Sequence, residues 1–186
     1  MIQQKTHIAV DDFEAFIARP ENRDRNFELI DGEIVEKMPT QIHGRIAARL
    51  SHMLYSYIDK HPIGHVEVEV RYRLPDDLHY SLQPDVAFFK DIDTPAVEKG
   101  PVFRMPDLAV EIKSPDDAFR QMRKKAEYYL ANGSQLVWLV FPENRQVEVY
   151  SSRANDTVTL TEQDTLDGGE VLPGFSLKVA DIFKTP

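Results

Sequence analysis

The sequence predicts an α/β domain in which helices flank a mixed β-sheet. Residues 107–141 have the order strand, helix, strand, a crossover unit whose two strands should lie parallel or close in one sheet. Hairpin signals stand on both sides of this unit, at Asp31-Gly32 and at "PENR" (142–145). A length of 186 residues suits one domain, 1–186, enclosing one core.

The N-terminal elements follow from local patterns. "VDDFEAFI" (10–17) predicts a short first helix. In "FELI-DG-EIVE", Asp31-Gly32 suits the positive φ angles of a two-residue type I′ turn, which indicates a hairpin. From Thr40 we expect a helix of about 20 residues, because apolar side chains recur at every fourth position. This apolar stripe, which should pack against a sheet, comprises Ile42, Ile46, Leu50, Leu54 and Ile58.

The middle of the chain reads as strands. "VEVEVRYR" (66–73) alternates strictly between apolar or aromatic and charged residues, which predicts a strand with one solvated face. "PDVAFF" and "DLAVEIK" predict two more buried strands. The Pro- and Asp-rich segment between them, "KDIDTPAVEKGP", is typical of a loop within one domain.

The second half completes the sheet. A helix is expected from about Asp117 to Asn132, closed by Gly133 as a C-terminal cap. The apolar run "QLVWLVF" predicts the next strand, and "QVEVY" returns beside it across "PENR".

Charge and composition narrow the function. The formal net charge is -9, which argues against a general nucleic-acid binder. The distribution of charge weakens this argument, because residues 1–36 carry -5 and residues 151–186 carry -3, so the middle of the chain carries only -1. Without cysteine, a metal would be held by carboxylate, histidine or backbone oxygen, which favours Mg²⁺. No window is apolar enough for a membrane helix and no signal peptide is visible, so we expect a soluble, cytoplasmic protein.

Two charged residues interrupt a strand that otherwise looks buried. Glu111 and Lys113 should share one face of it, about 6 to 7 Å apart. Asp85 begins another apolar run, directly after Pro84, which cannot donate to a neighbouring strand. If the two strands are adjacent, Asp85 and Glu111 converge, and a proton or cation must lie between them.

This combination suits phosphodiester hydrolysis. The ammonium of Lys113 could hold a water in line and balance charge that grows in the transition state. Glu28 is a candidate third acid, since Phe27 and Leu29 point to the opposite face of its strand. Glu-x-Lys alone is a weak signal, and a structural salt bridge between Glu111 and a neighbour is the alternative.

These motifs together resemble a known family. The order "FELIDGEIVE…QIHGRI…LQPDVAFF…DLAVEIKSPDD…KKAEYYLANGSQLVWLVFPENRQVEVY" closely resembles the Uma-two family, whose members look like restriction endonucleases of the PD-(D/E)XK superfamily. The resemblance extends from about Asp11 to Phe183. It implies a restriction endonuclease-like core with an added N-terminal hairpin. Pro84-Asp85 and Glu111-Ile112-Lys113 would be the signature, and Glu28 the acid of the N-terminal element.

The resemblance also suggests further site residues. By analogy, the backbone carbonyl of Ile112 would face the metal together with Asp85 and Glu111. Lys125 matches a lysine of the family and could reach the site or a phosphate, or lie on the surface. It belongs to a cluster that is either a basic strip or a solvated helix face: Arg120, Arg123, Lys124 and Lys125. His43 matches the family's "HG" and could touch the site, although a lone histidine more often caps or packs.

The function expected from these features is Mg²⁺-dependent endonucleolytic hydrolysis of DNA phosphodiester bonds, with Mn²⁺ as an alternative ion. The competing hypothesis is a catalytically silent module that keeps the nuclease fold as a binding or assembly scaffold. We also expect a homodimer, because cutting a duplex generally needs two active sites with matched spacing. "HVEVEVRYR" and the long helix are the candidate contact surfaces.

Overall fold

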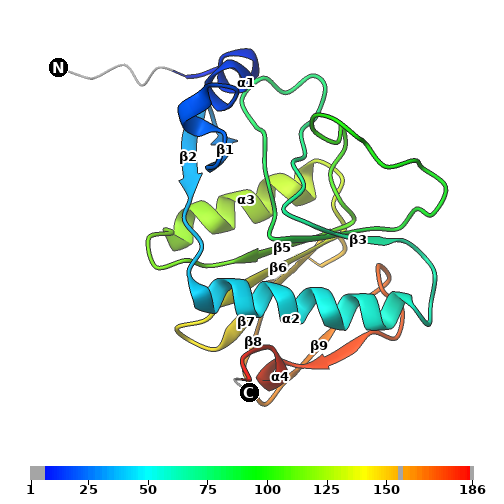
Figure 1. Ribbon diagram of the computed structural model, residues 1–186. Helices are drawn as coiled ribbons and strands as arrows, with labels where there is room; N and C mark the ends of the chain where they lie inside the picture. The colour runs from blue at the N-terminus through cyan, green and yellow to red at the C-terminus, as the bar shows by residue number, and fades with distance from the viewer. Residues whose placement is uncertain (1–6, 155–156, 185–186) are drawn as a thin grey trace.

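A six-stranded mixed sheet forms the centre of the computed structural model, which describes residues 7–154 and 157–184 (Figure 1). Only β5 and β6 pair in parallel; the other neighbours are antiparallel. In spatial order the strands are β3 (His65–Val68), β4 (Val86–Phe89), β5 (Leu108–Ile112), β6 (Leu136–Phe141), β7 (Gln146–Ser151) and β8 (Val158–Leu160).

Helices and two small antiparallel sheets surround this centre. One small sheet pairs β1 (Asn26–Ile30) with β2 (Glu33–Lys37), and the other pairs β9 (Thr165–Asp167) with β10 (Ser176–Lys178). The helices are α1 (Val10–Ile17), α2 (Gln41–Ile58), α3 (Phe119–Ala131) and the short α4 (Val179–Ile182), with a 3₁₀ turn, η1 (Pro20–Asn22).

The two long helices cover opposite faces of the central sheet (Figure 1). Side chains alternate along each strand, so Val86 and Phe88 of β4 pack with α2, whereas Ala87 packs on the other side with Ala126 of α3. The sheet is therefore buried on both faces, which explains why its central strands are almost continuously apolar.

The N-terminal predictions are confirmed. The first helix spans Val10–Ile17, and the hairpin turns at Asp31 and Gly32 with φ angles of 51° and 70°. Phe13 of α1 and Phe27 of β1 bury one side of the hairpin. The opposite side of the β1–β2 hairpin faces the central sheet.

The apolar stripe of α2 is confirmed except at its first member. Ile46, Leu50, Leu54 and Ile58 are buried, but Ile42 is 54% exposed. Four residues correspond to slightly more than one helical turn, so a strict four-residue repeat drifts by about 40° at each step. One end of such a stripe must leave the sheet, and here it is the end that carries Ile42.

The strand predicted over 66–73 is too long. β3 ends at Val68, because Glu69 adopts a left-handed conformation with φ of 54°. Val68 is consequently 47% exposed instead of buried. Tyr72 is buried but lies outside the sheet: its backbone forms isolated bridges to Leu82 and Val102, and its ring packs against Phe89 of β4.

The crossover unit is confirmed. β5 and β6 pair in parallel through α3, and Gly133 follows that helix with φ of 112°. The hairpin of β6 with β7 is also present, and residues 90–101 form no helix or strand. None of the helices within residues 7–154 and 157–184 is long and apolar enough to cross a membrane.

Candidate active site

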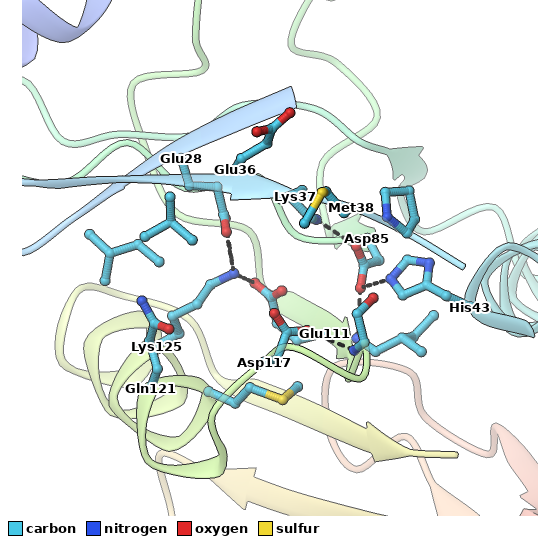
Figure 2. Close-up of a pocket in the computed structure, with 16 residues that line it drawn as sticks. Glu28, Glu36, Lys37, Met38, His43, Asp85, Glu111, Asp117, Gln121 and Lys125 are labelled. Atoms are coloured by element: carbon cyan, nitrogen blue, oxygen red, sulfur yellow. Dashed lines mark hydrogen bonds and ion pairs between the residues drawn. The ribbon is translucent and has the colours of Figure 1, made fainter. Parts of the chain in front are cut away.

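A pocket lies where the β1–β2 hairpin, the start of β4, the end of β5 and the helices α2 and α3 meet (Figure 2). Its cavity of about 40 Å³ can hold a water molecule or a small ion. The antiparallel register pairs Val86 with Val110, which brings Asp85 beside Glu111 as predicted. The charged or titratable side chains that line the pocket are Glu28, Glu36, Lys37, His43, Asp85, Glu111, Asp117 and Lys125.

Asp85 is held by main-chain and side-chain contacts. Its own N–H donates to the carbonyl of Val110 (3.0 Å), and its Oδ2 accepts from the N–H of Ile112 (2.6 Å). Lys37 Nζ lies 2.5 Å from Oδ1, and His43 Nε2 lies 3.0 Å from Oδ2. Burial alone would raise the pKa of Asp85, but the Lys37 charge and the His43 hydrogen bond outweigh burial and hold this pKa below its usual range.

Glu111 is more deeply enclosed. Lys125 Nζ lies 2.6 Å from its Oε1, and the Tyr129 hydroxyl donates to the same oxygen at 2.9 Å. Burial raises the pKa of Glu111 to about 7; Lys125 opposes this increase, whereas the carboxylates of Glu28 and Asp85 add to it.

Glu28 reaches the pocket from β1. Both of its carboxylate oxygens lie 2.9 Å from Lys125 Nζ, and one accepts a hydrogen bond from the N–H of Gln83 (2.7 Å). Lys125 therefore lies between Glu28 and Glu111, as Figure 2 shows. Burial would lower the pKa of Lys125, but these two carboxylates raise it above its ordinary value.

The structure does not bring Lys113 to the other predicted residues. Lys113 is buried but does not line the pocket; its Nζ lies 3.1 Å from Glu143 Oε1 and 5.0 Å from the centre of the Phe119 ring. Its neighbours Ile112 and Ser114 do line the pocket. The position expected for the Lys113 ammonium is held by Lys125.

The remaining alternatives are decided by burial and contacts. Lys125 is buried, so its placement on the surface is wrong, and the four basic residues of α3 do not form one strip. Arg123 pairs with Glu148 on β7, outside the pocket. His43 directs its ring to Asp85, while the side chain of Thr40 caps α2 by accepting from the His43 N–H.

Lys37 is the site residue that sequence reasoning missed. A signal for it existed: the two-residue turn fixes the hairpin register, which pairs Glu28 with Val35 and Asn26 with Lys37. Cross-strand partners share a face, so Lys37 had to lie on the same side of the hairpin as Glu28.

The donors suit a hard divalent cation. Mg²⁺ is usually bound through one or two carboxylates, with water and phosphate oxygens completing the shell, and Asp85 and Glu111 provide such a pair. Among the described residues, no group of three or more His, Asp or Glu side chains is arranged so that it could hold a metal ion as it stands. The carboxylates are instead paired with Lys37 and Lys125, so a cation would have to displace these contacts.

The fold is that of a nuclease-like protein. A crystal structure described as "a putative nuclease belonging to DUF820 from Anabaena variabilis ATCC 29413" superposes with a TM-score of 0.80 and 25% sequence identity, covering 95% of this chain and 97% of that one. The Uma2 family, described as "Putative restriction endonuclease", matches residues 10–180, and the chain belongs to this family. No curated protein matches the sequence.

Proposed function

We propose that the protein is a Mg²⁺-dependent endonuclease that hydrolyses DNA phosphodiester bonds. Asp85, Glu111 and the backbone carbonyl of Ile112 would hold the ion, and Mn²⁺ could replace Mg²⁺. When bound, the ion would supply Lewis-acid chemistry toward the phosphodiester. The family and the fold support the class of nuclease. The ion, the substrate and the residue roles are our proposal.

The observation that carries the proposal is the convergence of three buried carboxylates. Glu28, Asp85 and Glu111 are each no more than 4% exposed and come from separate segments of the chain. Burying several like charges together costs stability, and groups whose pKa values are strongly shifted gather at functional sites. The structural salt-bridge alternative explains one pair more readily than three acids in one pocket.

Other residues in and around the pocket have proposed roles that follow from their contacts. The Lys125 ammonium can offset negative charge that develops on a phosphate in the pocket, the role expected earlier for Lys113. Tyr129 orients Glu111, and His43 orients Asp85, each through a direct hydrogen bond. Lys113, packed against Phe119 and Glu143, would instead position the end of β5.

A catalytically silent module remains the second candidate, and one observation favours it. Asp85 pairs with Lys37, and Glu28 and Glu111 share Lys125, so each acid already contacts a cation of the protein itself. In this hypothesis the ion pairs are the final state of the pocket, and no divalent ion enters.

Plasmid cleavage and calorimetry separate the two candidates. With Mg²⁺ or Mn²⁺, the wild type should nick or linearise supercoiled DNA, and a chelator should stop it. Asp85→Asn and Glu111→Gln should each reduce cleavage about a hundredfold or more, and should weaken the metal binding measured by isothermal titration.

The matched control is Glu148→Gln. Glu148 is also a buried, ion-paired carboxylate, and it lies on the same face as Glu111, because Leu139 of β6 pairs with both residues. It does not line the pocket, so cleavage should persist. A wild type that neither binds a divalent ion nor cuts DNA would support the silent module.

A further inference from the structure

A second cavity, a groove of about 520 Å³, lies between α2, the β6–β7 turn and the C-terminal α4 region. We call it the α2 groove. None of its eleven lining residues is acidic, although the whole chain carries a net charge of -9. Those residues are Ile42, Arg45, Ile46, Ala48, Arg49, His52, Pro142, Arg145, Ile182, Phe183 and Lys184.

The cations of the groove differ in their availability. Arg145 pairs with Glu162 at 2.6 Å, and Lys184 pairs with Asp181 at 2.5 Å. Arg45 and Arg49 form no ion pair within the described part of the chain. Two guanidinium groups in the groove are therefore free to bind an anion.

The sequence of α2 maintains this excess of positive charge. Acidic residues make up 31 of 186 positions, or one in six, so an 18-residue helix would be expected to contain three. α2 contains none, and its arginines therefore lack the carboxylates at neighbouring turns that commonly pair with them. Arg45, Arg49 and His52 follow one another along the exposed side of the helix.

The α2 groove and the active-site pocket are lined by residues that are neighbours in the sequence. Ile42 lines the groove, whereas the next residue, His43, lines the pocket. Pro142 of the β6–β7 turn also lines the groove, and the residue after it, Glu143, pairs with Lys113 at the end of β5. Because both sites include residues of the first turn of α2, a polymer bound in the pocket is placed to extend toward the groove.

We propose that the α2 groove binds the phosphate backbone of duplex DNA next to the bond that is cut. The proposal rests on the proposed function for its choice of DNA. Guanidinium groups suit phosphate because their planar donors match its oxygens. Arg45 and Arg49 stand one helical turn apart, about 6 Å along the axis, and would contact two backbone phosphates. Ile42, which is 54% exposed, lines the groove and directly precedes His43 of the pocket.

Binding in the presence of a chelator tests the groove without cleavage. The wild type, the double variant Arg45→Gln/Arg49→Gln and a control are titrated into a fluorescently labelled DNA duplex at several salt concentrations, with anisotropy as the readout. The double variant should bind about tenfold or more weakly. Its slope of log affinity against log salt should fall by about 2, because two phosphate contacts are lost.

The matched control is Arg19→Gln/Arg23→Gln. These arginines also stand four positions apart and form no ion pair in the described residues, but they lie beside η1, away from the groove. The control loses the same charge as the groove variant, but outside the groove. Its affinity for the duplex should therefore stay within about twofold of the wild type. Circular dichroism confirms that each variant is folded.

Three outcomes would overturn the inference: equal loss of affinity in both double variants, no loss in the Arg45/Arg49 variant, or tighter binding of an RNA duplex of the same sequence. Failure of the proposed function gives a different result. In that case the groove variant loses duplex binding as expected, but the wild type does not cut DNA with Mg²⁺ or Mn²⁺.

Discussion

Lys113 and Lys125 are both buried lysines close to the end of β5, and their surroundings suggest different roles. Lys125 contacts two carboxylates that are almost fully buried, Glu28 and Glu111. Lys113 faces Glu143, whose side chain is 43% exposed, and the ring of Phe119. Of these two lysines, Lys125 is therefore the one that places its charge in the pocket.

We predict that Lys125→Met lowers plasmid cleavage about a hundredfold or more, since it removes the ammonium that offsets phosphate charge. Lys113→Met, the matched substitution, should lower cleavage much less. Because Lys125→Met also leaves two buried carboxylates without their cation, Lys125→Arg is the companion variant that keeps the charge, and melting curves identify any variant that fails to fold. Cleavage that depends on Lys113 but survives Lys125→Met would reverse the assignment.

Glu148 makes a pH-dependent contribution to folding stability, and this contribution does not involve the pocket. Burial would raise its pKa, but hydrogen bonds from Arg123 and Tyr150 outweigh burial and lower the pKa below its ordinary value. A carboxylate with a lowered pKa in the folded state stabilises the protein above its unfolded pKa, about 4, and loses this effect as the pH falls through the folded pKa.

We therefore expect Glu148→Gln to reduce the melting temperature at pH 7 and to have a smaller effect near pH 3. Half of the Arg123 side chain is exposed, so solvent screening weakens its ion pair with Glu148. The free energy of unfolding at pH 7 should therefore differ between the wild type and the variant by about 1 kcal/mol at most. Thermal melts of both proteins across this pH range provide the measurement. A difference that grows on acidification would have the wrong sign.

At the scale of elements, α2 offers a matched pair of isoleucines one turn apart. Ile46 is 5% exposed within the core, whereas Ile42 is 54% exposed in the α2 groove. Ile46→Ala should destabilise the fold by about 2 to 4 kcal/mol, and Ile42→Ala by no more than about 0.5 kcal/mol. Urea unfolding of the two variants measures both values. Similar costs would contradict the drift of the apolar stripe away from the sheet at Ile42.

The elements that could be predicted are those with a local cause. Asp31-Gly32 dictates its own turn, and the period of α2 and the apolar runs of β5 and β6 are long enough to be unambiguous. The strand over 66–73 failed because its alternation carries no mark of the left-handed Glu69. The short β8, β9 and β10 have too few residues for any pattern.

The site could be predicted in part for the same reason. Asp85 and Glu111 are conspicuous because each is a charge within an apolar run, and strand pairing then places them together. Which lysine approaches them depends on how α3 and the hairpin are packed over β5. Sequence spacing favoured Lys113, whereas Lys125 arrives from the helix and Lys37 from the hairpin.

For the whole molecule, we still expect a homodimer, since one small acidic domain has little basic surface and duplex cutting needs paired sites. β3 is an edge strand of the central sheet, and its partly exposed Val68 makes this edge a candidate contact surface. If the α2 groove holds DNA, it cannot also hold the partner. Light scattering at tens of micromolar protein measures the molar mass in solution, and the mass of a monomer would contradict this prediction.

The pairing of the pocket acids with Lys37 and Lys125 also sets an order of events during the life of the molecule. In small zinc domains the metal must arrive before the chain can fold, because binding supplies the folding energy. Here the acids already have internal counterions, so a newly made chain can fold first and bind the proposed ion afterwards. Removing divalent ions should then leave a folded molecule, and the proposed DNA cleavage should return when the ions are added back.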